Sequence, residues 1–174
     1  MKINKQDILK GSINSILSNW NRNYKHQGGL SSLIKCILGT FFCYSAREKN
    51  PRKKIEILTF SVIPGLTYFW FKCLRSIKNF RNTSVTIGDC SGRLKIKDKD
   101  LNLNLYPIIN LEHGYKLDLF FRKICNSDYV VVSDDDIFFQ NSEPLDWAIN
   151  QFNKNNNLAV VSLYPRRDKV SRLD

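Results

Sequence analysis

The sequence lacks an uninterrupted apolar segment long enough to cross a membrane. Its longest apolar run, Leu30–Ala46, is interrupted by Lys35. A helix of this length spans about 25 Å, whereas the hydrocarbon core of a bilayer is about 30 Å thick. We therefore expect a soluble or peripheral protein. The alternatives for the run itself are a helix packed on a neighbouring surface, a shallow helix on a membrane surface and a true transmembrane span.

Disulfide and zinc patterns are also missing. The five cysteines are Cys36, Cys43, Cys73, Cys90 and Cys125, an odd number with no C-x-x-C spacing. The histidines, His26 and His113, lie far apart, so no His–Cys zinc site follows from their spacing. This usage favours a reducing cytosol in which the thiols act as small buried apolar groups.

Acidic residues are outnumbered, with 16 Asp and Glu against 27 Lys and Arg, which gives a formal net charge of +11. A basic protein favours nucleic acid, anionic membranes or phosphate-bearing substrates, and composition does not choose among them. One phosphate-binding class is excluded. No G-x-x-x-x-G-K-[ST] loop is present, as a P-loop nucleoside triphosphatase requires.

The chain of 174 residues divides near residue 50. Residues 1–50 predict a basic helical extension, with helices over 11–23 and 30–50 on either side of the flexible HQGG. Residues 51–174 predict one α/β domain. Its expected strands are 54–60, 84–89, 107–111, 129–133 and 158–165, and its expected helices are 66–80, 114–128 and 143–154. Strands that alternate with helices indicate a mostly parallel sheet with right-handed crossovers.

Acidic residues follow two of the expected strands. Asp89 ends the strand SVTIGD, and Asp134–Asp136 follow YVVVS. Ligands of such sheets gather at the carboxyl ends of the strands, so these acids predict one site. Asp89 then either accepts hydrogen bonds from a nucleobase or ribose or makes local turn bonds.

Three consecutive carboxylates repel one another unless a cation or donor compensates them. Mg²⁺ or Mn²⁺ takes carboxylate oxygens and keeps positions for water and phosphate. A D-x-D spacing leaving a strand would send Asp134 and Asp136 to the same side, so we predict that these two bind the metal. The alternative is a solvated turn that caps the next helix.

Several segments resemble the nucleotide-binding half of the family 2 glycosyltransferases, which have the GT-A fold. They are KIEILTFSVIP, CLRSIKNF, SVTIGDCSGR and NSDYVVVSDDDIFF, within roughly residues 54–165. The resemblance implies a GT-A, Rossmann-like fold and a nucleotide-diphosphate sugar as donor. It implies transfer of the sugar to an acceptor hydroxyl on a glycan, a lipid-linked molecule or a protein, as in polysaccharide biosynthesis.

The resemblance also implies roles for individual residues. Ser61 would lie near the nucleoside, and Asp89 would contact the base. Asp134 would contact ribose or metal, and Asp136 would bind the metal at the diphosphate. Asp135 belongs to the same donor site, but of the three aspartates it is the one whose side chain would turn away from the metal.

The chain departs from the family pattern in three places. Asp89-Cys90-Ser91-Gly92 replaces the usual Asp-Asp-Gly-Ser. The arginine that often precedes the D-x-D strand is absent, and His113 and Lys116 stand there as candidate phosphate ligands. The acceptor part after Asp136 is short or missing. Asp168 and Asp174 are candidates for the catalytic base by residue type alone, so none is assigned.

Other readings stay open. The chain could be a truncated enzyme, one completed by a partner, or a domain that binds the donor without turnover. A haloacid-dehalogenase-like phosphatase also places D-x-D after an apolar strand, although there the motif opens the domain. A basic nucleic-acid-binding domain would suit the charge, but the acidic cluster would repel phosphates, so we expect no nucleic acid partner. The expected location is cytoplasmic, with peripheral contact at the cytoplasmic face of the membrane.

Overall fold

The computed structural model describes residues 20, 24–25, 28–45, 53–77, 83–96 and 102–161. The chain forms two compact units, Met1–Phe138 and Phe139–Asp174, and each is described by itself. Several predictions lie outside the described residues: nearly all of the expected helix 11–23, His26, and the base candidates Asp168 and Asp174.

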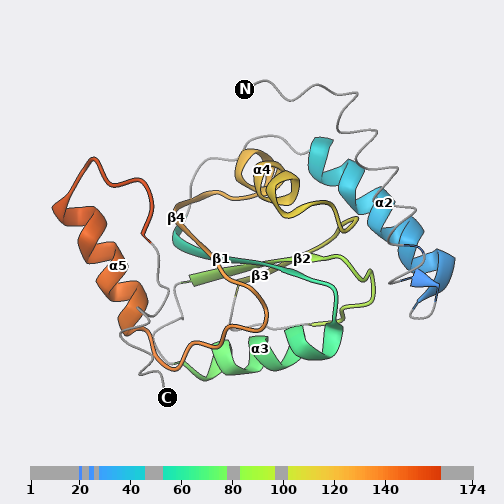
Figure 1. The fold of residues 1–174 in the computed structure, drawn as a ribbon, viewed down its shortest axis with the longest axis horizontal. Helices are drawn as coiled ribbons and strands as arrows, with labels where there is room; N and C mark the ends of the chain where they lie inside the picture. The colour runs from blue at the N-terminus through green and yellow to red at the C-terminus, as the bar shows by residue number, and fades with distance from the viewer. Residues whose placement is uncertain are drawn as a thin grey trace, which may run out of the picture. The chain divides into compact units, whose positions relative to one another are not determined.

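The first unit is built on a four-stranded, all-parallel sheet (Figure 1). Its strands are β1 (Lys53–Ser61), β2 (Thr83–Asp89), β3 (Asn102–Pro107) and β4 (Ser127–Val132). Their order across the sheet is β3-β2-β1-β4. The predicted α/β class and parallel sheet are confirmed. The central strands β1 and β2 are buried along most of their length, as expected for strands covered on both faces.

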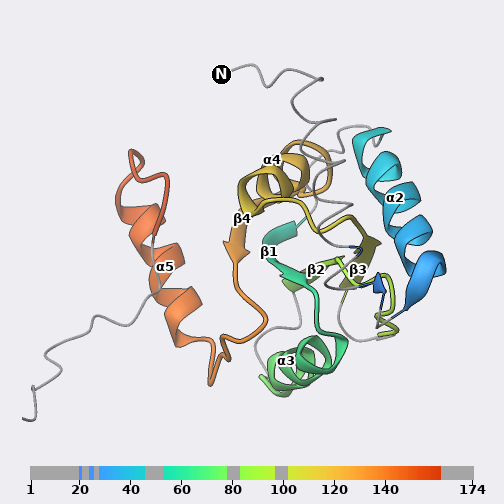
Figure 2. The ribbon, with the colours of Figure 1, turned by 45° about the vertical axis from the view of Figure 1, so that its right-hand side comes forward.

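Helices cover both faces of this sheet. They are α2 (Gly29–Ser45), α3 (Pro64–Ser76) and α4 (His113–Lys123). Figures 1 and 2 show α2 and α4 on one face and α3 on the other. Side chains of β1 alternate between these faces. Phe60 packs edge-to-face on Phe120 of α4 with ring centroids 4.9 Å apart, whereas Ser61 bonds to Thr67 of α3.

The third strand lies earlier than predicted. We expected it at the apolar residues 107–111, but β3 begins at Asn102 and ends at Pro107. The segment N-L-N-L-Y alternates polar and apolar residues, which suits a strand at the edge of a sheet. The apolar residues after it, Ile108, Ile109 and Leu111, are buried as a connection rather than as a strand. Burial, not strand pairing, explains their composition.

In the second unit, α5 (Glu143–Lys154) has the predicted bounds, with the acidic Glu143 and Asp146 in its first turn. The expected fifth strand at 158–165 is not observed over residues 158–161, and its other residues lie outside the described ranges. Within the described part of the chain, none of the helices has the length and apolar content that crossing a bilayer requires.

Helix α2 is joined to the loops that follow β2 and β3. Lys35 Nζ donates to the carbonyl of Gly92 (3.2 Å), and Cys36 Sγ lies 3.6 Å from the carbonyl of Asp89. The amide of Ile109 donates to Thr40 Oγ1 (2.8 Å). A helix from the predicted N-terminal extension therefore packs on the sheet within the first unit.

The cysteines lie where small apolar side chains are expected. All five are free thiols, and Cys36, Cys43 and Cys90 are fully buried. Cys43 and Cys90 belong to a core cluster with Leu58 and Phe120. Burial raises the pKa of Cys36 and Cys43 from 9.0 to about 11, and that of Cys90 to about 12. The folded protein therefore holds these protons more tightly than the unfolded chain.

This difference predicts a loss of stability at alkaline pH. A raised folded-state pKa contributes stability that is complete below pH 9.0 and is lost as pH rises toward 11 to 12. In that window, each buried thiol lowers the free energy of unfolding by about 1.4 kcal/mol per pH unit. Urea unfolding between about pH 8 and about pH 10.5 should show this slope. Cys43→Ala removes one titrating group and should make the slope shallower, whereas an unchanged slope would contradict the assignment.

Candidate functional site

The carboxyl ends of β1, β2 and β4 meet at one edge of the sheet. Ser61 of β1 is paired with Asp89 of β2, and Leu58 of β1 is paired with Val132 of β4. The amide of Ser133 donates to the carbonyl of Leu58 (2.9 Å), which continues this pairing up to the aspartate run. The predicted neighbourhood of Asp89 and Asp134–Asp136 is therefore present, with β1 between the two acidic strand ends.

Among the three consecutive aspartates, Asp135 contacts the sheet and α3. Thr67 Oγ1 lies 3.0 Å from Asp135 Oδ2, and Ser61 Oγ makes a short hydrogen bond with Thr67 Oγ1. Ser61 can donate to Thr67 while Thr67 donates to Asp135, which gives a chain of hydroxyl bonds ending on the carboxylate. Asp135 is half-buried, and Asp134 and Asp136 are exposed.

Asp135 points differently from its two neighbours, because its carboxylate faces Thr67 whereas those of Asp134 and Asp136 are exposed. The amide of Ile137 donates to the carbonyl of Asp134 (3.2 Å), so residues 134–137 form a turn. The alternation that holds along a strand no longer applies there. The turn directs Asp135 toward Thr67 and leaves the carboxylates of Asp134 and Asp136 at the surface.

Asp89 organises its own loop. Its side chain is 1% exposed. Oδ1 accepts from the amide of Ser91 (2.9 Å), the hydroxyl of Ser91 (2.5 Å) and the amide of Gly92 (3.0 Å), and Oδ2 accepts from the amide of Leu94 (2.9 Å). Gly92 has φ of 66°, and a Cβ there would lie 2.6 Å from the carbonyl oxygen of Ser32. Four donors thus occupy the carboxylate that the resemblance assigns to a nucleobase.

The two basic candidates come from the first turn of α4. Lys116 is 7% exposed, and its ammonium donates to Asn110 Oδ1 (2.9 Å) and lies 5.1 Å from the ring centroid of Phe60. The exposed His113 contacts the same ring edge-to-face at 5.8 Å. Phe60 is the penultimate residue of β1, so both side chains are at the carboxyl edge with the acids.

Charges of both signs at this edge affect the pKa of the Cys90 thiol. Burial is the main cause of its raised pKa; the charge of Lys116 lowers the pKa and that of Asp135 raises it. The charges of Cys36 and Asp89 raise it further. The edge combines a buried cation with a half-buried carboxylate.

The carboxylates match the ligand type of Mg²⁺ or Mn²⁺, which bind oxygen. Within the described residues, no three His, Cys, Asp or Glu side chains are grouped so that they could hold a metal by themselves. Mg²⁺ is often held through one or two carboxylates together with substrate phosphates. Asp134 and Asp136 suit that mode, in which the bound substrate completes the coordination.

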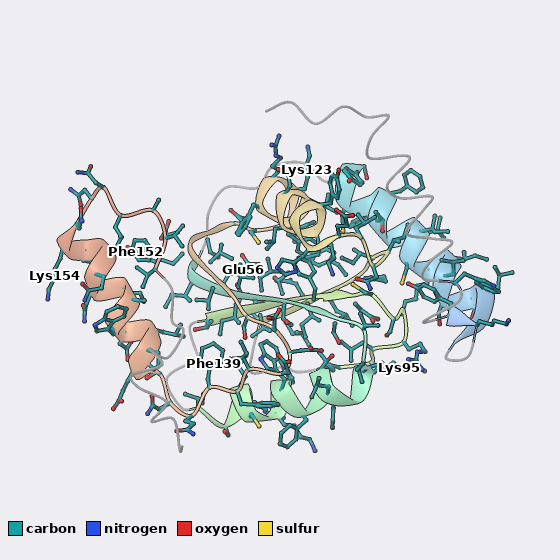
Figure 3. All side chains as sticks on the ribbon, viewed as in Figure 1. Glu56, Lys95, Lys123, Phe139, Phe152 and Lys154 are labelled. Atoms are coloured by element: carbon teal, nitrogen blue, oxygen red, sulfur yellow. The ribbon has the colours of Figure 1, made fainter. Side chains whose placement is uncertain are left out.

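A second buried carboxylate, Glu56, lies away from this edge, on the α4 side of the sheet (Figure 3). Its Oε1 accepts from the hydroxyl of Thr86, and its Oε2 accepts from the amide of Asn126 (3.2 Å) and the hydroxyl of Ser127 (3.1 Å). These partners belong to or adjoin β2 and β4. Glu56 therefore ties the central strand to both neighbours and has a structural role.

Two residues of the edge were not predicted from the sequence. Thr67 bonds the carboxylate of Asp135, and Asn110 accepts from Lys116. Neither belongs to a chemical motif, and each is separated from its partner in sequence. The turn signal before α3 places Thr67 in the first turns of a helix, but its partner follows only from the pairing of β1 with β4.

No family model matches the chain, and the searches of curated proteins and of solved structures give no match either.

Proposed function

We propose that the carboxyl edge of the sheet binds a nucleotide-diphosphate sugar, and that the protein is a metal-dependent glycosyltransferase with a GT-A-type donor domain. The observation that supports this most directly is the environment of Lys116. Its side chain is 7% exposed, and within the described residues its ammonium bonds an uncharged amide oxygen rather than a carboxylate. A buried cation is unfavourable unless an anion pairs with it, and a diphosphate would supply that anion.

The acids of the opposite loop provide the second support. Asp134 and Asp136 are exposed where β4 ends, and their oxygens are suitable ligands for a divalent cation. Such a cation, when bound, would neutralise charge on the leaving diphosphate. Asp135, which is half-buried and bonded to the buried Thr67, lies next to them and can accept a hydrogen bond from a ribose or sugar hydroxyl.

In this proposal the phosphate-binding and metal-binding residues lie on different sides of the edge. Lys116 binds a phosphate oxygen, and His113 is available beside it. Asp134 and Asp136 would hold the metal, and Asp135 would accept a hydrogen bond from a hydroxyl group of the nucleotide sugar. The sugar passes to an acceptor hydroxyl on a glycan, lipid-linked molecule or protein, and a base takes that hydroxyl's proton. No residue of the described edge is assigned as the base.

The proposal predicts nucleotide binding that depends on metal and on these side chains. Titration calorimetry with UDP and GDP should detect binding with Mn²⁺, and EDTA should abolish it. Asp134→Asn/Asp136→Asn should weaken binding by about 100-fold, because it removes both anionic metal ligands. Lys116→Met should weaken it by about tenfold, the value of one bond to a charged group.

The matched control is Asp128→Asn. Asp128 is an exposed aspartate near the amino end of β4, the strand that Asp134 and Asp136 follow. Asp128→Asn removes one negative charge away from the carboxyl edge, so the affinity for the nucleotide should stay unchanged. Failure of both nucleotides to bind with metal present would contradict the proposal, as would binding to Asp134→Asn/Asp136→Asn with undiminished affinity.

A further inference from the structure

Helix α2 carries a row of large apolar side chains on its outer side. Their exposed fractions run from 47% for Ile34 to 70% for Phe41. The members are Leu30, Ile34, Leu38, Phe41 and Phe42, and we call them the outer face of α2. Scattered exposed apolar residues are ordinary, but a contiguous row on one helix marks a contact surface.

The outer face is separate from the face that packs on the sheet. At 3.6 residues per turn, its five residues fall within an arc of about 120°. The buried residues fall on the opposite arc, and they are Ser32, Leu33, Cys36, Thr40 and Cys43. Figures 1 and 2 both show α2 at the margin of the first unit, with one side toward the sheet and the other away from it. The fold therefore already uses one face and leaves the other without a role.

The charges around this helix point to one kind of partner. Helix α2 contains no acidic residue, and its single charged residue, Lys35, is basic. The sequence after it, AREKNPRKK at residues 46–54, has five basic residues and one acidic residue. The whole chain has a formal net charge of +11. An apolar face beside a basic segment is typical of helices that lie in the surface of an anionic membrane.

We infer that the outer face of α2 binds the surface of an anionic lipid bilayer, with the helix parallel to the membrane plane. Seventeen residues is too short for a span, but all five side chains of the outer face can enter the interface together. The basic residues then pair with lipid phosphates or carboxylates. This inference does not depend on the proposed nucleotide site.

A second copy of the chain is the less favourable occupant. Pairing two outer faces would bring together two chains of +11 and place their basic segments near each other. Like charges destabilise such a contact, whereas an anionic surface is stabilised by the same residues. The electrostatics therefore favour lipid over self-association.

The test is flotation of the full chain with two kinds of vesicle, phosphatidylcholine alone and phosphatidylcholine with about one third phosphatidylserine. Partitioning should require the anionic lipid and should fall in about 1 M salt, where the Debye length is about 3 Å. Phe41→Ser/Phe42→Ser should reduce partitioning at least tenfold. Leu38→Glu, which adds a negative charge to the middle of the face, should abolish it.

The control is Phe69→Ser, which removes an exposed phenylalanine from α3 on the other face of the sheet and should leave partitioning unchanged. Far-ultraviolet circular dichroism of each variant checks that the fold is retained. Three results would overturn the inference. They are undiminished binding by Phe41→Ser/Phe42→Ser, absence of binding to anionic vesicles, and a dimer in sedimentation equilibrium that this double variant converts to a monomer.

Discussion

Gly39→Ala is expected to lower the free energy of unfolding by about 3 kcal/mol or more. A Cβ at residue 39 would lie 1.9 Å from the carbonyl oxygen of Pro107 and 2.9 Å from its carbonyl carbon. These are backbone atoms at the end of β3, so no side-chain rotation relieves the clash. Helix α2 would have to move away from the sheet and lose its buried contacts. Urea unfolding followed by circular dichroism measures the change.

Two other helical glycines provide matched controls. Neither Gly65 of α3 nor Gly114 of α4 has an atom within 4 Å of an added Cβ. Alanine is the better helix former by up to about 1 kcal/mol, so Gly65→Ala and Gly114→Ala should be neutral or stabilising. Alanine is also the better helix former at residue 39. A loss of stability in Gly39→Ala, set against the neutral or stabilising controls, therefore measures the steric clash. A Gly39→Ala protein as stable as the parent would show that α2 does not approach β3 so closely.

Asp89→Ala is expected to destabilise the protein by about 3 to 5 kcal/mol, because it leaves buried donors without an acceptor. Four donors from Ser91, Gly92 and Leu94 converge on this carboxylate. Asp89→Asn should have a smaller effect, since its amide oxygen can still accept at the Oδ1 position. Chemical unfolding of the two variants gives the comparison.

A surface aspartate supplies the control for Asp89. Asp118 pairs with Arg122 one turn along α4 in an exposed ion pair, and Asp118→Ala should change stability by less than about 1 kcal/mol. Nucleotide titrations of folded Asp89→Asn separate the two roles of residue 89. Unchanged affinity leaves Asp89 as the organiser of its loop. A large loss of affinity without a loss of stability would instead support contact with the base.

Most elements of the fold could be predicted because the spacing of their apolar residues agrees with the residues that begin and end them. YVVV and KIEILTF are dense in β-branched and apolar residues, and α5 begins after a serine with proline and acids in its first turn. The error at β3 has a clear cause. An apolar segment such as 107–111 is buried equally well in a connection, whereas an edge strand can be half polar.

The candidate site could be predicted only to the level of the strand ends. Asp89 and Asp134–Asp136 were located because acids that end apolar strands stand out in a sequence. The hydrogen-bond partners of these aspartates could not be predicted from the sequence. Asp135 faces Thr67 because a turn replaces the strand at Asp134, and Asp89 is enclosed because its loop folds back over it. Both depend on tertiary structure that composition does not encode locally.

The attachment of α2 has a mechanical consequence. Its contacts with Gly92, Asp89 and Ile109 lie at or just after the carboxyl ends of β2 and β3, and Gly39 meets the end of β3 without an intervening side chain. These contacts couple the position of α2 to the positions of the two strand ends. Whatever holds the outer face of α2 therefore also sets the orientation of the carboxyl edge relative to the surface that holds it.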